Sequence, residues 1–283
     1  MKPTVEAVFG RADNVFLSDG GWGSELFKLG LTVGESPERW NIEHSDKVQK
    51  IADSYVAAGS DIILTNSFGA NKFVLSNHGL ESEVIRINKL AVDISRKAAG
   101  SSALVFASLG PTGKKVSKGE INIDDAKSAF TEQAFALRDA GADAIVIETM
   151  TDIDEFAVAV SSAVISGLPV VGSMSFDSDF DCERMAKVAV ENGAAMVGAN
   201  CGEGIEKYMV IAESLIKHST VPVWIKANAG LPVFENRCTV YKQEPSEYAE
   251  YAKKLKEMGV RVIGGCCGTS PLHIIQLRKM VNS

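Results

Sequence analysis

Eight short apolar runs alternate with amphipathic stretches along this chain, and this alternation limits the folds that it can adopt. Each run is apolar almost throughout, as in parallel strands that are buried on both faces. We predict strands at residues 15–18, 61–65, 103–108, 144–148, 170–173, 196–200, 221–227 and 260–264. Apolar residues recur about every 3.6 positions between the runs. We therefore predict helices at residues 45–58, 81–99, 124–140, 152–166, 182–192, 205–218, 245–258 and 271–281.

Glycines mark several predicted helix ends, where a residue in the left-handed conformation commonly closes a helix. These are Gly59, Gly141, Gly167, Gly193 and Gly259. Eight β-then-α units in 283 residues predict an α/β protein with one (β/α)8 TIM barrel over residues 1–283. A doubly wound open sheet is the alternative. The first strand, however, leads into residues 19–23 (DGGWG), which lack the glycine spacing of a dinucleotide-binding turn.

Three of the five cysteines fall where predicted strands end, which is where a (β/α)8 barrel places its chemistry. Cys201 ends the sixth strand, and Cys266 and Cys267 follow the eighth. Three thiolates can hold Zn²⁺ with one coordination position open. Neighbours on a regular strand point to opposite faces, so the vicinal pair can share an ion only where flanking glycines let the backbone leave strand geometry. A buried, purely structural cysteine pair is the alternative.

A zinc ion held by three thiolates is suited to binding a substrate thiol. A free thiol has a pKa of about 8.5 and is mostly protonated at neutral pH, whereas metal binding favours the nucleophilic thiolate. The reaction that this site would serve is S-alkylation, with the open position taking the substrate sulfur. The other two cysteines, Cys182 and Cys238, fall in a helix start and a loop, and we expect structural roles for them.

Two carboxylates at strand ends, Asp19 and Glu148, would complement a substrate ammonium group, which would offset the cost of burying them. Gly20 and Asn200 are the further candidate substrate-binding residues at strand ends. Each carboxylate has a structural alternative. The charge of Glu148 could interact favourably with the dipole at a helix N-terminus, and Asp19 could accept hydrogen bonds from the turn backbone of residues 20–23.

The composition argues against several classes of protein. The net charge is −7, and lysine and arginine are scattered, so we expect no nucleic-acid partner. The apolar runs are too short to span a bilayer, and residues 1–14 lack a secretory signal, so we expect no membrane association. Five cysteines do not indicate a disulfide framework, which favours a reducing, cytoplasmic location.

The chain resembles the homocysteine S-methyltransferase family of zinc-dependent thiol methyltransferases over nearly its whole length. The motifs that carry this resemblance are residues 19–26 (DGGWGSEL), 37–41 (PERWN), 65–71 (TNSFGAN), 200–201 (NC) and 264–269 (GGCCGT). The resemblance implies zinc on Cys201, Cys266 and Cys267 and homocysteine as the methyl acceptor. It also implies that Asp19 and Glu148 hold the amino group, with strand-end backbone nearby holding the carboxylate.

Within this family the chain is most similar to the homocysteine-binding domain of cobalamin-dependent methionine synthase, on the TNSFGAN run and on residues 227–232 (ANAGLP). Betaine-using relatives carry an aromatic residue where this chain has Thr149. Because the chain stops at Ser283, the resemblance implies that the methyl group comes from a separate corrinoid protein carrying cobalamin, or from a small methylated donor. One departure from the pattern is residues 176–181 (FDSDFD), a short connection on the expected active face.

Other functions stay open at the level of sequence. A small cationic donor would call for an aromatic cage, to which Trp22 and Trp40 could contribute, although Trp40 is equally consistent with packing. A corrinoid-linked methyltransferase that demethylates another compound is one alternative. A non-catalytic barrel that binds a metal or an amino acid is another.

Overall fold

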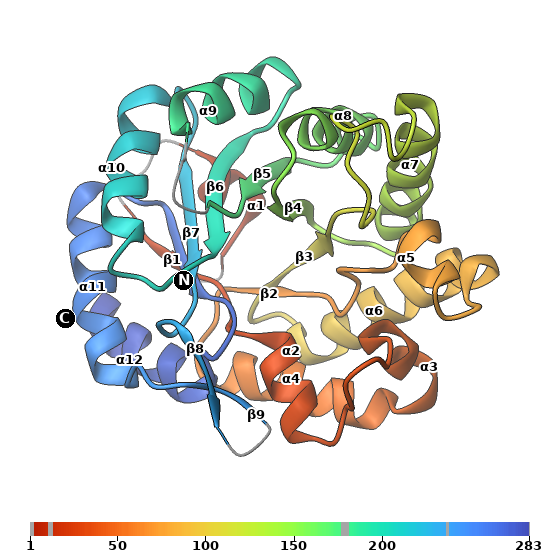
Figure 1. Cartoon of the computed structure of the whole chain (residues 1–283). Coiled ribbons are helices and arrows are strands. Elements are labelled where there is room, and N and C mark those ends of the chain that lie inside the picture. The colour runs from red at the N-terminus through yellow and green to blue at the C-terminus, as the bar shows by residue number, and fades with distance from the viewer. Residues whose placement is uncertain (1–2, 11–13, 177–180, 236–237, 283) are drawn as a thin grey trace.

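A computed structural model of the chain describes residues 3–10, 14–176, 181–235 and 238–282. Within these ranges, eight parallel strands form one sheet in the order β1-β10-β7-β6-β5-β4-β3-β2 (Figure 1). The strands are β1 (Phe16–Leu17), β2 (Ile62–Leu64), β3 (Leu104–Leu109), β4 (Ala144–Met150), β5 (Val170–Met174), β6 (Met196–Cys201), β7 (Val223–Ala227) and β10 (Val262–Gly265). A bridge between Ser18 and Ile62 joins the two edge strands. The predicted TIM barrel is therefore confirmed, and the open sheet is excluded.

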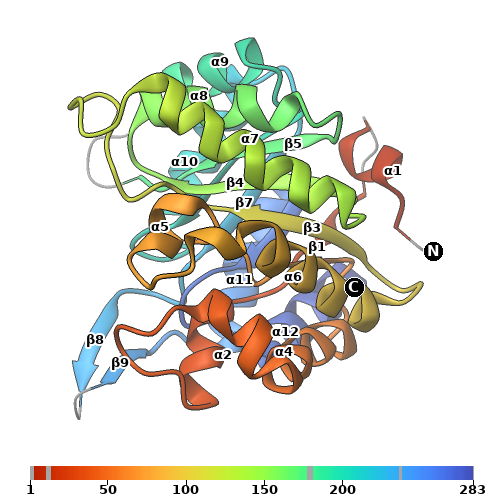
Figure 2. The same ribbon diagram turned by 90° about the vertical axis from the view of Figure 1, so that its right-hand side faces the viewer.

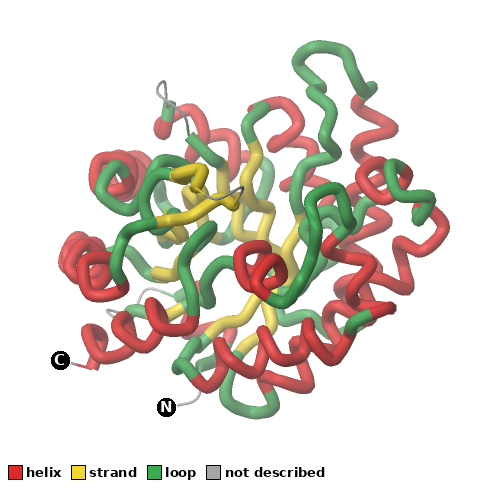
Figure 3. Tube along the Cα trace, turned by 60° about the horizontal axis from the view of Figure 1, so that its bottom comes forward, coloured by secondary structure: helices red, strands yellow, loops and turns green. Residues whose placement is uncertain are grey.

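Helices surround the strands on the outside of the barrel, as Figure 3 shows. The main ones are α4 (Ser45–Ala57), α6 (Val84–Ala99), α7 (Ile123–Asp139), α8 (Ile153–Val164), α9 (Cys182–Glu191), α10 (Tyr208–His218), α11 (Pro245–Met258) and α12 (Pro271–Asn282). Shorter elements are α1 (Val5–Phe9), α2 (Trp22–Lys28), η1 (Pro37–Arg39), α3 (Trp40–Glu43), α5 (Lys72–Ser76) and η2 (Glu81–Glu83). A separate antiparallel hairpin consists of β8 (Pro232–Glu235) and β9 (Cys238–Tyr241).

The predicted barrel strands and main helices agree with the structure to within three residues at each end. The five glycines predicted to close helices all have φ between +85° and +99°. The hairpin β8–β9 was not predicted, and it lies between the strand predicted at residues 221–227 and the helix predicted at residues 245–258. Its side chains do not follow the burial pattern that identifies a barrel strand, since Phe234 and Val240 are exposed to solvent.

Two of the three apolar clusters among the described residues form the main cores of the barrel. One lies between the sheet and the helices, and the other fills the barrel interior with inward-facing side chains from successive strands. Inside the barrel the ring of Phe106 stacks on Trp224 at 6.1 Å and on Phe9 of α1 at 5.7 Å. Figure 2 shows α1 and both chain ends toward one end of the barrel and the hairpin β8–β9 projecting from the other. The helix α1 therefore covers the end opposite the hairpin.

In the part of the chain that the structure describes, we find no helix with both the length and the apolar character that a bilayer crossing requires.

The aromatic stack should contribute strongly to stability. Phe106 is fully buried, so Phe106→Ala should lower the free energy of unfolding by about 3–5 kcal/mol through lost burial and a residual cavity. The matched control is Phe27→Ala, because Phe27 is 53% exposed and its loss should change stability by about 0.5 kcal/mol or less. Urea unfolding followed by circular dichroism measures both variants. Equal losses would mean that the stack is not a major stabilising contact.

Candidate active site

The three candidate thiols come together because of the register of β7. Ala227, the last residue of β7, pairs with Cys201 on one side and with Gly265 on the other. Beyond that level, the Cys266 N–H donates to the Ala227 carbonyl at 2.7 Å. The Asn228 N–H donates to the carbonyl of Cys201 at 3.1 Å. The end of β7 is thus hydrogen-bonded to both cysteine-bearing segments and holds them at one level.

The backbone leaves strand geometry at the vicinal pair, as the sequence predicted. The strand β10 ends at Gly265, one residue before Cys266. A Cβ atom at Gly265 would lie 2.2 Å from the hydroxyl of Thr269, and Gly268 has a φ of +81°. Glycine is therefore needed at both positions for the tight turn that carries Cys266 and Cys267.

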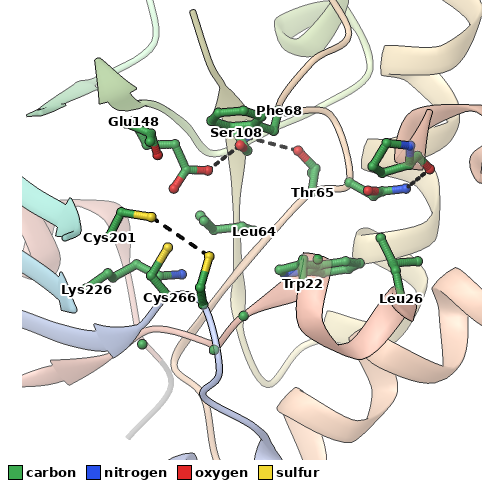
Figure 4. Close-up of a pocket in the computed structure, with 18 of the residues that line it drawn as sticks. Trp22, Leu26, Leu64, Thr65, Phe68, Ser108, Glu148, Cys201, Lys226 and Cys266 are labelled. Carbon is green, nitrogen blue, oxygen red and sulfur yellow. Dashed lines mark hydrogen bonds between the residues drawn. The ribbon is translucent and has the colours of Figure 1, made fainter. Parts of the chain in front are cut away.

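The sulfur atoms form a compact cluster. The ligand atoms of Cys201, Cys266 and Cys267 all lie within 4.8 Å of one another, and the Cys201 and Cys267 sulfurs are 3.8 Å apart (Figure 4). Hydrogen bonds with Cys266 and Cys267 raise the pKa of the Cys201 thiol. The hydrogen bond with Cys201 lowers the pKa of Cys267. Hydrogen bonding among the three thiols therefore favours a thiolate at Cys267.

This donor set fits a zinc ion. A zinc–sulfur bond of about 2.3 Å in a tetrahedral site places two sulfur ligands about 3.8 Å apart, the separation found between Cys201 and Cys267. The three cysteines are partly exposed and line one cavity, so a fourth ligand can reach the cluster from that side. With an ion bound, three protein ligands and an open fourth position would match the pattern of a catalytic rather than a structural zinc.

Glu148 lies on the inward face of β4 beside the cluster. Its side chain is 8% exposed and lines the cavity, and the Ser108 hydroxyl of β3 donates to its Oε1 atom. Burial, partly offset by the positive charge of Lys226, raises the pKa of Glu148 to about 7. The interpretation of Glu148 as a helix-start residue is wrong, because Asp152 is the residue that caps α8.

Asp19 lies behind the cavity and is fully buried. Its carboxylate pairs with the ammonium group of Lys226. It also accepts hydrogen bonds from the Trp22 indole N–H at 2.7 Å, the Leu64 N–H at 2.6 Å and the Ser18 hydroxyl at 3.2 Å. These donors belong to a side-chain and strand network, so the alternative of bonds to the turn backbone of residues 20–23 is wrong.

Asn200 is also fully buried, and it connects two strained strand ends. Its side-chain oxygen accepts from the Thr149 N–H at 2.9 Å and the Ser173 hydroxyl at 2.7 Å. Its amide nitrogen donates to the Thr149 hydroxyl at 2.7 Å. Thr149 and Cys201 have φ values of +60° and +68°, in the left-handed region. Asn200 therefore holds the backbone beside Glu148 in position, rather than lining the cavity itself.

The cavity in front of the thiols has a volume of about 330 Å³. Figure 4 shows Cys201, Cys266, Lys226 and Glu148 at one side of it, with Trp22 and Leu26 toward the other. Of the predicted site residues, Gly20, Glu148 and the three cysteines line this cavity, whereas Asp19 and Asn200 lie behind its wall. The remaining lining residues are Gly21, Trp22, Gly23, Leu26, Pro37, Glu38, Leu64, Thr65, Asn66, Phe68, Ser108, Thr149, Lys226 and Gly265.

Sequence reasoning missed Lys226, Ser108 and Tyr241. Lys226 and Ser108 lie within strands, at positions that face inward just before the strand ends. A lysine inside the apolar run of residues 221–227 was the available signal, since a buried lysine needs a partner. Tyr241 comes from the unpredicted hairpin. Its ring packs on Gly268, and burial together with the charge of Cys267 raises its pKa.

The remaining expectations have mixed outcomes. Cys182 is buried at the start of α9, where burial raises its pKa to about 11, as expected for a structural thiol. Trp40 is buried against His44 and Lys47, so it is a packing residue and not part of a cage. The side chain of Cys238 and most of the connection at 176–181 lie outside the described residues.

The chain is similar to known proteins over most of its length. The family model described as homocysteine S-methyltransferase matches residues 16–281. Methionine synthase of Mycobacterium leprae (strain TN) is 30% identical over 298 aligned residues, which cover 95% of this chain and 24% of that protein. Betaine–homocysteine S-methyltransferase 1 of Mus musculus is 28% identical over 293 residues, which cover 93% of this chain and 71% of that protein.

Among solved structures, the metallated form of the homocysteine methyltransferase MmuM from Escherichia coli shares the fold with a TM-score of 0.79. It is 21% identical, and the match covers 97% of this chain and 99% of that one. The chain spans about a quarter of the length of the methionine synthases that it matches. Because one family model accounts for residues 16–281, the chain belongs to the homocysteine S-methyltransferase family of enzymes.

Proposed function

We propose that this protein is a zinc-dependent methyltransferase that methylates the thiol of homocysteine to give methionine. The observation that carries this proposal is the cluster of three sulfur atoms, all within 4.8 Å of one another, beside a cavity. Cys201, Cys266 and Cys267 would hold the ion. Bound Zn²⁺ would act as a Lewis acid that favours the ionised form of the acceptor thiol. A reducing, cytoplasmic location would keep the three thiols available.

Glu148 is the residue to which we assign the acceptor ammonium group. Its carboxylate lines the same cavity as the thiols, and Ser108 fixes one of its oxygens. Asp19 has four donors of its own, so we assign it an indirect role through Trp22 and Lys226. Asn200 would act through the backbone of Thr149, which adjoins Glu148.

In the proposed reaction the thiol proton leaves as the acceptor binds. The sulfur electron pair forms a new carbon–sulfur bond with the methyl group. The bond between the methyl group and its donor breaks, and the donor leaves with that electron pair. The protein contributes by holding the acceptor sulfur and the amino group at fixed positions, so that the methyl carbon meets an oriented nucleophile.

Two classes of donor are consistent with the site. Similarity to methionine synthases, of which this chain spans about a quarter, supports a methyl-corrinoid protein carrying cobalamin as the partner. The aromatic side chains of Trp22 and Phe68 on the cavity wall support a small cationic donor. A methyl-transfer assay with homocysteine and methylcobalamin, S-methylmethionine or betaine distinguishes them. If the zinc-loaded protein methylates homocysteine with none of these donors and does not bind it, the proposed function is wrong.

The cysteine ligands can be tested separately from the fold. Cys266→Ser and Cys201→Ala should each lower bound zinc and methyl transfer at least about tenfold, because one ligand of three is lost. Thermal unfolding should change little, since these thiols lie at the mouth of the barrel and not in its cores.

The matched control is Cys182→Ala, which removes a buried thiol outside the cluster and should leave zinc content unchanged. Elemental analysis gives zinc content, and circular dichroism reports the fold. Global unfolding of the ligand variants would instead indicate a structural metal.

Glu148 should make acceptor binding depend on pH. Its pKa of about 7 means that a proton competes with the acceptor ammonium below neutral pH. The preference for homocysteine over 4-mercaptobutyrate, which lacks the amino group, should therefore fall about tenfold per pH unit below 7 and level off above it.

Calorimetric titrations from pH 5.5 to 8.5 measure this ratio, and the thiol that both ligands share cancels from it. In Glu148→Gln the ratio should be small and independent of pH, with zinc content unchanged. An unchanged profile in this variant would remove Glu148 from ammonium binding.

A further inference from the structure

We propose that the ammonium group of Lys226 binds the carboxylate of the acceptor and so makes the site specific for thiols that carry an acid group. This inference rests on the proposed function. It concerns a residue inside β7 that directly precedes the strand-end motif of residues 227–232.

The position of Lys226 is built into the barrel. It follows Trp224 by two residues and faces inward, immediately above the aromatic layer. Its side chain is only 2% exposed, yet it lines the cavity together with Cys266 and Glu148. Gly264 on the neighbouring strand has no side chain and so leaves space for that of Lys226. A Cβ atom at this position would lie 3.2 Å from Lys226 Cγ and 2.8 Å from Ser18 Cβ.

The hydrogen bonds of Lys226 leave one donor for a ligand. An ammonium group has three N–H donors. One reaches the Asp19 carboxylate, and a second reaches the Ser18 hydroxyl at 3.3 Å. No other acceptor within the described residues forms a hydrogen bond with this group. The ammonium group also lies 5.9 Å from the centroid of the Trp224 ring, so an acceptor atom supplied by a ligand in the cavity would complete its hydrogen bonds.

The charges on the cavity wall match an amino acid. Lys226 supplies a positive charge, and Glu148 supplies a carboxylate with only one oxygen engaged by Ser108. The other acid on the wall, Glu38, is held by the Ser36 hydroxyl at 2.9 Å and the Gly69 N–H at 2.7 Å. An acceptor with its sulfur at the thiol cluster would therefore place its ammonium group on Glu148 and its carboxylate on Lys226.

A competing role for Lys226 is general stabilisation of the thiolates, because its positive charge lines the same cavity as the three cysteines. Such an effect would act equally on every thiol ligand. Carboxylate binding would act only on ligands that have a carboxylate. The two roles therefore differ in which ligands are affected.

The test is a calorimetric titration of the zinc-loaded full chain with three thiols. Homocysteine carries both groups, 4-mercaptobutyrate lacks the amino group, and 3-mercaptopropylamine lacks the carboxylate. The variants are Lys226→Met and the double variant Asp19→Asn/Lys226→Met, which leaves no uncompensated buried carboxylate and so protects the fold. Lys242→Met is the matched control, because Lys242 is an exposed lysine of the chain that pairs with Glu235.

Both Lys226 variants should bind homocysteine and 4-mercaptobutyrate about 10- to 100-fold more weakly, as expected for a lost charged hydrogen bond. They should bind 3-mercaptopropylamine within about threefold of the unmodified protein, and the control should match it for all three ligands.

An equal loss for all three ligands in the double variant, or no loss for any, would overturn the role of Lys226 while leaving the proposed function standing. If the unmodified zinc-loaded protein binds none of the three thiols, the proposed function fails and the role of Lys226 fails with it.

Discussion

The register at the end of β7 is the constraint on which the candidate site depends. Ala227 pairs with Cys201 in β6 and with Gly265 in β10, so residues far apart in sequence end at the same level. In a parallel sheet buried on both faces, a one-residue shift would turn every side chain to the wrong side. The same packing that specifies the barrel therefore specifies the separation of the three sulfurs.

A polar layer lies directly above the apolar interior of the barrel. Lys226 follows Trp224 on β7, and Ser108 follows Phe106 on β3, so each charged or polar group faces inward one pleat after an aromatic residue. Replacing a buried ion pair by well-packed apolar residues is often neutral or stabilising. Stability alone therefore does not account for the pair of Asp19 and Lys226. Lys226 lines the cavity together with the thiols, and Asp19 lies behind it, which fits a role of Asp19 in positioning the ammonium group of Lys226.

Backbone strain is concentrated at the carboxyl ends of β4 and β6, beside the cavity. Among the described residues other than glycine, only Thr149 and Cys201 have positive φ, which costs on the order of 1–3 kcal/mol for each residue. Asn200 makes three hydrogen bonds that oppose this strain, and its own carbonyl accepts from the Tyr208 hydroxyl at 2.6 Å. The surroundings thus hold Glu148 and Cys201 in a rigid frame, which suits a site that must orient a nucleophile.

The sequence by itself determined the barrel and its order of elements, because burial periodicity and helix-closing glycines are local signals. It also placed three cysteines at the ends of predicted strands, where a barrel gathers its functional side chains. It also indicated Glu148, since a carboxylate at the end of an apolar strand is visible in the pattern. Only the tertiary structure showed that the carboxylate of Asp19 forms an ion pair with Lys226 and that Asn200 lies behind the cavity wall. Those facts depend on partners in other strands, and the spacing of residues along one strand carries no information about what faces them across the barrel.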